Sequence, residues 1–239
     1  MGNLPKVLEL LLKQTFNIKK TGHQNLETVR KQVNDISKDF KEHKEGMSPV
    51  QLLNTLNSHF NNDYILASDV GMHRHVSSIF FNAKFPEDFV TSPGLSSFGT
   101  GLPLGIGAKI VNPNRNVVII AGDGGFHSSS GDIETVVRQK LKVLIIILNS
   151  SSNTLIERYE LTGKDRVINR ATTSFNYVNF VKLATANGCP AIRAKNIQQL
   201  KSALSIFDKS SQPLLIEIPV YYPKMYVNKF AKIFEKETK

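Results

Sequence analysis

The 239 residues, 41% hydrophobic and 21% charged, suffice for one large domain or two small ones, and no stretch reaches the roughly 18 apolar residues of a membrane span. The net charge is +10, but the lysines are dispersed through the N-terminal segment and the tail without interleaved aromatic residues, so neither a membrane nor a nucleic acid is expected as a partner. The start of the chain lacks a signal peptide, which makes the cytoplasm the expected location.

Residues 1–46 are rich in charge and carry apolar residues at helical spacing, but they contain no motif that indicates a chemistry. A new helix is predicted over 50–60, because Ser48-Pro49 offers a cap and a proline for the first helical turn. We therefore expect three parts: a helical linker or the end of a preceding domain in 1–46, one domain in 47–220, and a C-terminal helical tail in 221–239. The tail is interpreted as a surface helix, with a lid or a dimer contact as the alternatives.

Five short apolar runs alternate with helical stretches and predict β-strands at 64–68, 117–121, 143–149, 191–193 and 214–219. The runs at 117–121 and 143–149 are apolar on both faces, as strands of a parallel sheet covered by helices must be. This alternation predicts an α/β fold with a doubly wound, mostly parallel sheet and helices on both faces. Ligands of such sheets bind outside the carboxyl ends of the strands, so the functional residues should follow these runs directly.

Polar loops follow two neighbouring predicted strands. In the loop 122–125, glycines would let a ligand approach the backbone, and Asp123 offers a carboxylate to a hard cation. A helix expected to begin near Gly131 would add N–H groups for an anion. The next strand delivers oxygen-bearing side chains at 149–153. Gly-Asp-Gly alone would be interpreted as a tight turn, but the two loops together predict Mg²⁺ bridged to a phosphate.

The lone cysteine, Cys189, has no Cys or His at metal-ligand spacing, which indicates a small buried side chain in a reducing compartment. The basic composition leaves one further hypothesis open, an α/β domain that binds nucleic acid through its lysines. Binding to a random duplex that weakens steeply with salt would test that hypothesis.

The Gly-Asp-Gly motif and the strand-ending pair Asn149-Ser150 resemble, in spacing and flanking hydrophobicity, the signature of thiamine-diphosphate enzymes. Further segments resemble the acetolactate synthase family, and they lie at 69–73, 91–95, 99–108 and 112–113. The likeness covers roughly residues 47–219 and identifies a C-terminal thiamine-diphosphate-binding domain similar to that of the acetolactate synthase large subunit. Residues 2–8 resemble the end of the middle domain of that family, so residues 1–46 are expected to remain from a truncation.

The resemblance implies thiamine diphosphate and Mg²⁺ as cofactors and a small-molecule 2-keto acid as the substrate of decarboxylation and carboligation. It thus implies a transferase or lyase in which the cofactor is the electron sink. The alternatives are a 2-keto-acid decarboxylase and, in another class, a degenerate cofactor-binding module without catalysis. In the family, the activating glutamate comes from a separate pyrimidine-binding domain or subunit. We therefore expect no catalytic residue in this chain, little activity of the chain alone, and a homo-oligomer that is at least a dimer.

Residue by residue, the resemblance implies three metal ligands, namely the carboxylate of Asp123, the side chain of Ser150 and the backbone carbonyl of Ser152. The residues implied to contact the cofactor are Val70, Gly71, Met72, His73, Ser96, Phe98, Gly122, Gly124, Gly125 and Asn153. Among them, the His73 ring would donate to a phosphate oxygen and the Ser96 carbonyl would accept from the aminopyrimidine. Phe98 would bend the cofactor as an apolar wedge, with a plain core aromatic as the alternative.

The sequence departs from the family pattern at three places. Ser150 replaces the usual Asn and offers a shorter, weaker oxygen ligand to the metal. Phe98 is bulkier than the usual Met, Leu or Ile. Residues 151–153 replace a stretch that often carries glycine and aromatic residues. Substrate choice is therefore not carried over from the family.

Overall fold

The computed structural model describes residues 46–162 and 167–222, together with residues 31, 33, 35 and 37. The predicted N-terminal segment and helical tail therefore lie largely outside the described residues, and the proposed division into three parts stays a prediction. No helix within the described residues is long and apolar enough to cross a membrane.

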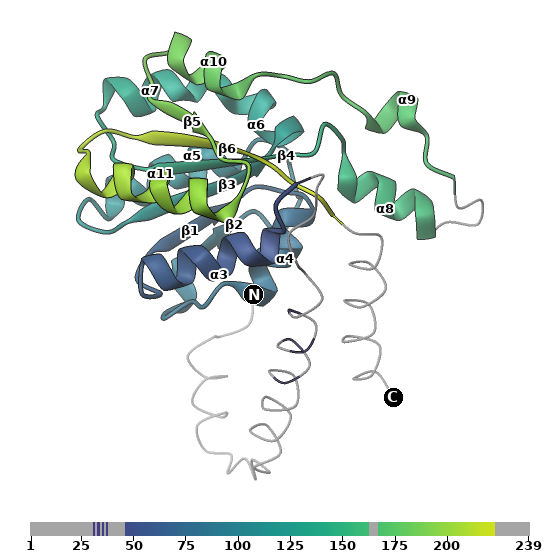
Figure 1. The fold of residues 1–239 in the computed structure, drawn as a ribbon, viewed down its shortest axis with the longest axis horizontal. Helices are drawn as coiled ribbons and strands as arrows, with labels where there is room; N and C mark the ends of the chain where they lie inside the picture. Colours follow the sequence, from purple (N-terminus) through teal and green to yellow (C-terminus); the bar gives the residue numbers. More distant parts are fainter. Residues whose placement is uncertain are drawn as a thin grey trace, which may run out of the picture.

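A six-stranded sheet with the order β2-β1-β3-β4-β6-β5 forms the centre of the described fold, and every neighbouring pair is parallel (Figure 1). The strands are β1 (Ile65–Ser68), β2 (Phe89–Thr91), β3 (Val117–Gly122), β4 (Leu144–Asn149), β5 (Ala191–Arg193) and β6 (Leu214–Pro219). This arrangement confirms the predicted parallel α/β sheet. The short edge strand β2, of three half-buried residues, was not predicted.

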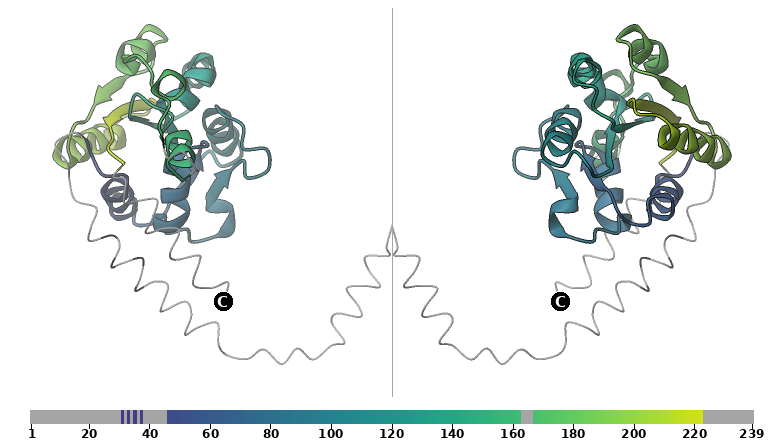
Figure 2. Two further views of the ribbon diagram at one scale, coloured as in Figure 1. Left: turned by 90° about the vertical axis from the view of Figure 1, so that its right-hand side faces the viewer. Right: turned by 90° about the vertical axis from the view of Figure 1, so that its left-hand side faces the viewer.

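Helices cover both faces of the sheet, as the side views show (Figure 2). On one face lie α3 (Pro49–His59), α4 (Met72–Phe80) and α11 (Ile197–Lys209). The other face is covered by α5 (Gly101–Val111), α6 (Asp123–Ser129), α7 (Ile133–Arg138) and α10 (Phe180–Ala186). The described part also contains α8 (Thr154–Thr162), α9 (Arg170–Thr173) and the 3-10 turns η1 (Pro86–Asp88) and η2 (Ser130–Asp132).

Strand β4 shows why its sequence is apolar throughout. Leu144, Ile146 and Leu148 belong to the core cluster on the α3 face, whereas Ile145 and Ile147 belong to the cluster on the α5 face. Successive side chains of a strand point to opposite faces, so a strand buried on both sides needs no polar positions. The uninterrupted apolar run is therefore a consequence of the two helical layers.

A helix does begin near Gly131, because α7 starts at Ile133 directly after η2, but an additional helix, α6, already begins at Asp123. Two glycines in its first turn disfavour helix. Packing outweighs this preference, because the fully buried Phe126 makes an edge-to-face contact with Phe180, with 5.5 Å between ring centroids. Helix α6 was not predicted, because this tertiary contact joins residues far apart in the sequence.

The strand order places a topological switch point between β1 and β3. From β1 the sheet continues to β2 on one side, and from β3 it continues to β4 on the other. Loops that leave the carboxyl ends of β1 and β3 consequently diverge and leave a crevice, which is where open α/β sheets bind ligands. Helix α8 follows β4 at this same edge (Figure 1).

Candidate functional site

A narrow polar cleft lies at the switch point, where the loops after β1, β3 and β4 meet. Its lining includes every predicted cofactor and metal residue except Ser96, namely Val70, Gly71, Met72, His73, Phe98, Gly122, Asp123, Gly124, Gly125, Ser150, Ser152 and Asn153. Leu148, Thr154, Leu155 and Tyr222 complete the described wall. The resemblance thus selected residues that the fold brings together from four separate loops, those after β1, β2, β3 and β4.

Asp123 is the central carboxylate of this polar cleft. It is 6% exposed, and its oxygens accept hydrogen bonds from the Gly124 N–H at 3.0 Å and the Ser150 N–H at 3.1 Å. Burial disfavours the charged form and raises the pKa of Asp123 to about 6, although the N–H groups around it act in the opposite direction. A divalent cation would stabilise the charged form at this position.

The two other predicted metal ligands lie side by side. The Oγ atom of Ser150 donates to the backbone carbonyl of Ser152 at 3.1 Å and shares a hydrogen bond with the Thr154 hydroxyl at 3.0 Å. Two oxygens on neighbouring corners of an octahedral Mg²⁺ site, with Mg–O distances of 2.0–2.1 Å, are about 3 Å apart. The spacing of the Ser150 and Ser152 oxygens therefore fits one Mg²⁺ ion that binds both.

The donor set also agrees with the usual mode of magnesium binding. No group of three or more His, Cys, Asp or Glu side chains that could hold a metal occurs among the described residues. An ion at this place would be held by one carboxylate, by neutral oxygens and by phosphate oxygens, which is how Mg²⁺ commonly binds in phosphate sites. The cleft measures only about 30 Å³, and we therefore expect the loops around it to move apart when a diphosphate binds.

His73 faces the polar cleft with one unsatisfied ring nitrogen. The side chain is buried, its ring is hydrogen-bonded to the Asp69 backbone, and Nε2 has no partner among the described residues. Burial lowers the pKa of His73 to about 3, so the ring is neutral at neutral pH. The ring packs so closely on Gly71 that a Cβ there would lie 2.5 Å from Cε1 of the ring.

This burial predicts a stability effect at acidic pH. An unfolded histidine titrates near pKa 6.5, whereas the folded value is about 3, so the unfolded state binds more protons between these limits. The folded chain should lose stability at His73 as the pH falls from about 6.5 towards 3. His73→Gln should remove this contribution, so the variant should lose less free energy of unfolding than the wild type between pH 7 and pH 5 in urea titrations. Equal losses in both proteins would contradict the prediction.

Asp69 organises the loop opposite Asp123, and the sequence reasoning did not identify it as a site residue. Its fully buried carboxylate accepts from the Val70 N–H at 2.7 Å and from the Gly99 and Thr100 N–H groups at 3.1 Å each. Burial raises the pKa of Asp69 despite these donors. The carboxylate thereby ties the strand exit of β1 to the loop that carries Phe98. Its position directly after a predicted strand and its place at the start of the family-like segment 69–73 were the sequence signals.

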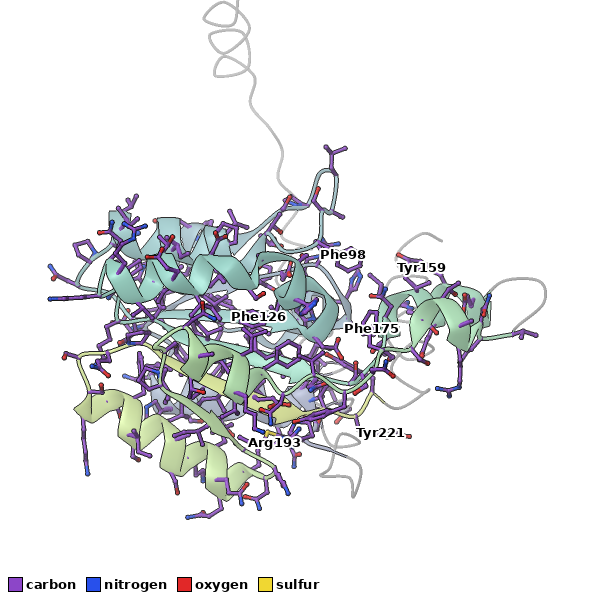
Figure 3. The ribbon with its side chains drawn as sticks, turned by 90° about the horizontal axis from the view of Figure 1, so that it is seen from above. Phe98, Phe126, Tyr159, Phe175, Arg193 and Tyr221 are labelled. Atoms are coloured by element: carbon purple, nitrogen blue, oxygen red, sulfur yellow. The ribbon has the colours of Figure 1, made fainter. Side chains whose placement is uncertain are left out.

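The structure separates the two residues predicted for the pyrimidine side of the cofactor. Ser96 does not line the polar cleft, and its hydroxyl accepts from the Arg74 guanidinium at 3.2 Å, so the role of its backbone carbonyl stays a prediction. Phe98 does line it, and with 49% of its surface exposed it is no core aromatic, so that alternative was wrong. Phe98 and Phe175 lie at the end of the molecule that faces α8 (Figure 3).

A larger apolar cavity of about 510 Å³ adjoins the polar cleft and was not predicted. The two share Phe98, Asp123, Gly124 and Asn153, and the remaining wall consists of His127, Ser128, Asn149, Ser174, Phe175, Asn176, Val178 and Phe180. The Phe175 ring covers Gly124 so closely that a Cβ there would lie 3.1 Å from it. Residues 174–178 form a loop without periodicity, so no sequence pattern indicated this wall.

Comparisons with known proteins agree with this geometry. The family model described as "Thiamine pyrophosphate enzyme, C-terminal TPP binding domain" matches residues 69–218. The chain is 29% identical over 174 residues to an acetolactate synthase of Bacillus subtilis (strain 168), which covers 73% of this chain and 30% of that protein. It is 30% identical over 170 residues to the acetolactate synthase isozyme 2 large subunit of Escherichia coli (strain K12), which covers 71% of this chain and 31% of that protein.

The chain thus spans about a third of the length of these curated relatives. A solved structure, a thiamine diphosphate-dependent 4-hydroxybenzoylformate decarboxylase of Rhodococcus jostii RHA1, superposes with a TM-score of 0.71 at 20% identity, over 77% of this chain and 34% of that one. This likeness supports the fold. The polar cleft, the matched residues and the shared fold together show that the chain belongs to the thiamine pyrophosphate enzyme family, as a C-terminal TPP-binding domain similar to that of acetolactate synthase large subunits.

Proposed function

We propose that this domain binds thiamine diphosphate through Mg²⁺ and serves an acetolactate-synthase-like enzyme that acts on 2-keto acids. The observation that carries the proposal is the composition of the polar cleft. It brings the Asp123 carboxylate together with the oxygens of Ser150 and Ser152, yet none of the described residues that line it is Lys or Arg. The charge of a diphosphate would therefore have to be neutralised by a metal ion.

Each proposed ligand has a distinct part. Asp123, the Ser150 hydroxyl and the Ser152 carbonyl would hold Mg²⁺, and Gly124 and Gly125 would let the diphosphate approach the backbone. Thiamine diphosphate supplies the electron sink for decarboxylation of a 2-keto acid. Phe98 stands between the polar cleft and the apolar cavity, where an apolar side chain can direct the organic part of the cofactor.

His73 would act at the phosphate through its free Nε2 atom. The neutral ring, with its other nitrogen hydrogen-bonded to the Asp69 backbone, can only accept at Nε2. Donation to a phosphate oxygen therefore requires the ring to take up a proton when the diphosphate binds. The negative charge of the ligand would favour this protonation.

The domain is proposed to work with a pyrimidine-binding domain or subunit in at least a dimer. In the family, the activating glutamate comes from that other domain, and we assign no catalytic residue to the described residues of this chain. The chain alone is expected to bind the cofactor weakly and to turn over little keto acid. Robust turnover by the pure chain would contradict this part of the proposal.

One observation favours a second function, a cofactor-binding module that has lost its metal. The Ser150 hydroxyl is already engaged by the Ser152 carbonyl and the Thr154 hydroxyl. A hydroxyl is also a weaker and shorter ligand than the asparagine carbonyl usual at this position. Metal binding would have to compete with these hydrogen bonds.

A calorimetric titration with thiamine diphosphate tests both functions. With Mg²⁺ present, the wild type should release heat at millimolar cofactor, and chelation of the metal should abolish it, because the cleft lining has no cationic side chain. The titration is repeated with Ser150→Asn. Little change would mean that serine is an accepted ligand, whereas a gain of about tenfold or more would support a degenerate site. Absence of heat from both proteins would contradict the proposed function.

A further inference from the structure

Glu217 is a buried carboxylate beneath the metal loop, which we define as residues 150–152. It lies on β6 and is fully buried, and its Oε1 atom accepts from the Asn149 side-chain amide and from the Arg193 guanidinium, at 2.8 Å each. Oε2 has no hydrogen-bond partner among the described residues. A buried carboxylate that is only partly satisfied opposes folding, so its presence calls for a physical reason.

The carboxylate determines which way the Asn149 amide points. An ionised carboxylate only accepts hydrogen bonds, so the Asn149 group that faces Glu217 must be the NH₂ group. The amide oxygen then faces the metal loop, where it accepts from the Ser151 N–H at 3.2 Å and from the Ser151 hydroxyl at 3.4 Å. Glu217 therefore acts on the metal loop through one intermediate side chain.

Ser151 is the residue of the metal loop that needs such support. Its φ angle is +52°, in the left-handed region that L side chains other than Asn and Asp rarely adopt. The Ser151 N–H donates to the Asn149 side-chain oxygen, and the Ser151 carbonyl accepts from the Phe175 N–H at 2.8 Å. Hydrogen bonds on both sides thus fix the strained residue.

The strained turn has a direct effect on the proposed metal ligands. Ser151 lies between Ser150 and Ser152, and the turn brings the Ser150 Oγ atom to 3.1 Å from the Ser152 carbonyl. In extended backbone, which rises about 3.3 Å per residue, the two residues would instead lie about 6.6 Å apart along the chain. The spacing suited to one Mg²⁺ ion therefore depends on the conformation of Ser151.

We propose that Glu217 is a positioning residue of the metal site, which holds the Ser151 turn through the orientation of Asn149 and so sets the spacing of the Ser150 and Ser152 oxygens. This inference rests on the proposed function for the identity of the ion, but not for the effect on the loop. The ion pair with Arg193, whose guanidinium lies 4.8 Å from the Tyr177 ring centroid, joins β5 to β6. The Arg193–Glu217 ion pair alone does not explain why Glu217 also accepts a hydrogen bond from Asn149 on β4.

Three variants of Glu217 and Asn149 test the inference by amide hydrogen exchange of residues 149–153. Glu217→Leu keeps the volume but removes the acceptor, so the Ser151 amide should exchange about tenfold faster in the chain without ligand. Glu217→Gln can still accept from the Asn149 amide and should keep the wild-type rate. Asn149→Ala removes the link from the other side, and it should loosen the loop even if Glu217→Leu fails to fold.

A rescue experiment separates positioning from general stability. Glycine adopts positive φ without strain, so Ser151→Gly should restore slow exchange of the 150–152 amides in the Glu217→Leu background, while Ser151→Ala should not. In the titration with thiamine diphosphate, Glu217→Leu should raise the Mg²⁺ concentration for half-maximal binding about tenfold, and Ser151→Gly should reverse part of this rise.

The outcomes distinguish this inference from the proposed function. Unchanged loop exchange in Glu217→Leu and Asn149→Ala, or a rescue by Ser151→Ala equal to that by Ser151→Gly, overturns the role of Glu217 whatever the titration shows. A wild type that releases no metal-dependent heat contradicts the proposed function, and the exchange rates still decide whether Glu217 holds the loop. Circular dichroism spectra that match the wild type confirm that each variant is folded.

Discussion

Removing the negative charge of Asp123 is expected to abolish metal-dependent binding of thiamine diphosphate and, where the side-chain shape is kept, to stabilise the chain that has no ligand at neutral pH. The carboxylate is the only anionic group in the described lining of the polar cleft. Without it, Mg²⁺ would be held by neutral oxygens alone, so Asp123→Ala should weaken metal-dependent binding about a hundredfold, or about 2.8 kcal/mol. Calorimetric titration with and without Mg²⁺ measures this loss, and unchanged heat in the variant would place the diphosphate elsewhere.

Removing the Asp123 charge should weaken ligand binding but increase the free energy of unfolding of the chain without ligand. The pKa of Asp123 is about 6 when folded and 3.8 in its ordinary range, so the folded state binds more protons between pH 4 and 6 and loses stability as the pH rises through this window. Asp123→Asn keeps the shape and removes the charge. It should raise the free energy of unfolding by about 1 to 3 kcal/mol at pH 7.5 and by less at pH 4. A variant less stable than the wild type at both pH values would contradict the assigned burial cost.

Removing the Asp69 carboxylate should cause the largest loss of stability among these substitutions. Asp69→Ala leaves the buried N–H groups of Val70, Gly99 and Thr100 without their acceptor, which should cost about 3 to 5 kcal/mol in urea unfolding. Gly125 packs against the same carboxylate so closely that a Cβ there would overlap Oδ2. The loss of Asp69 should therefore also disturb the loop that follows β3.

Two further variants define this effect. Asp69→Asn keeps one acceptor oxygen and removes a charge whose burial raises the pKa, so it should cost much less than Asp69→Ala. Asp208 is a matched control, because its carboxylate is about half exposed and pairs only with His59 among the described residues. Asp208→Ala should change the stability by less than about 1 kcal/mol. Equal losses for Asp69→Ala and Asp208→Ala would exclude an organising role for Asp69.

Local patterns in the sequence predicted most of the sheet. The apolar runs that became β3 and β4 are buried on both faces, and this property is visible in the residues themselves. The strand exits were predictable for the same reason, because a polar residue after such a run must leave the core. Asp123 and Ser150 could thus be placed at one edge of the sheet from the sequence alone.

Contacts between distant parts of the chain could not be predicted in this way. The carboxylate of Asp69 reaches Gly99 across 30 positions, and Asn149 reaches Glu217 across 68. Neither pairing leaves a periodic trace in the sequence. The hydrogen bond from Arg74 on α4 to the Ser96 hydroxyl is a further contact of this kind. The sequence did not indicate the side chains, such as Asp69 and Glu217, that support the binding loops without lining the cleft.

The small size of the polar cleft has a kinetic consequence. Asp123 joins the loop after β3 to the loop after β4 through the Ser150 N–H, and these loops border a cleft of only about 30 Å³. We expect the loops to separate before the cofactor enters. At high ligand concentration the observed association rate constant should level off at the opening rate of the loops and no longer increase with ligand concentration.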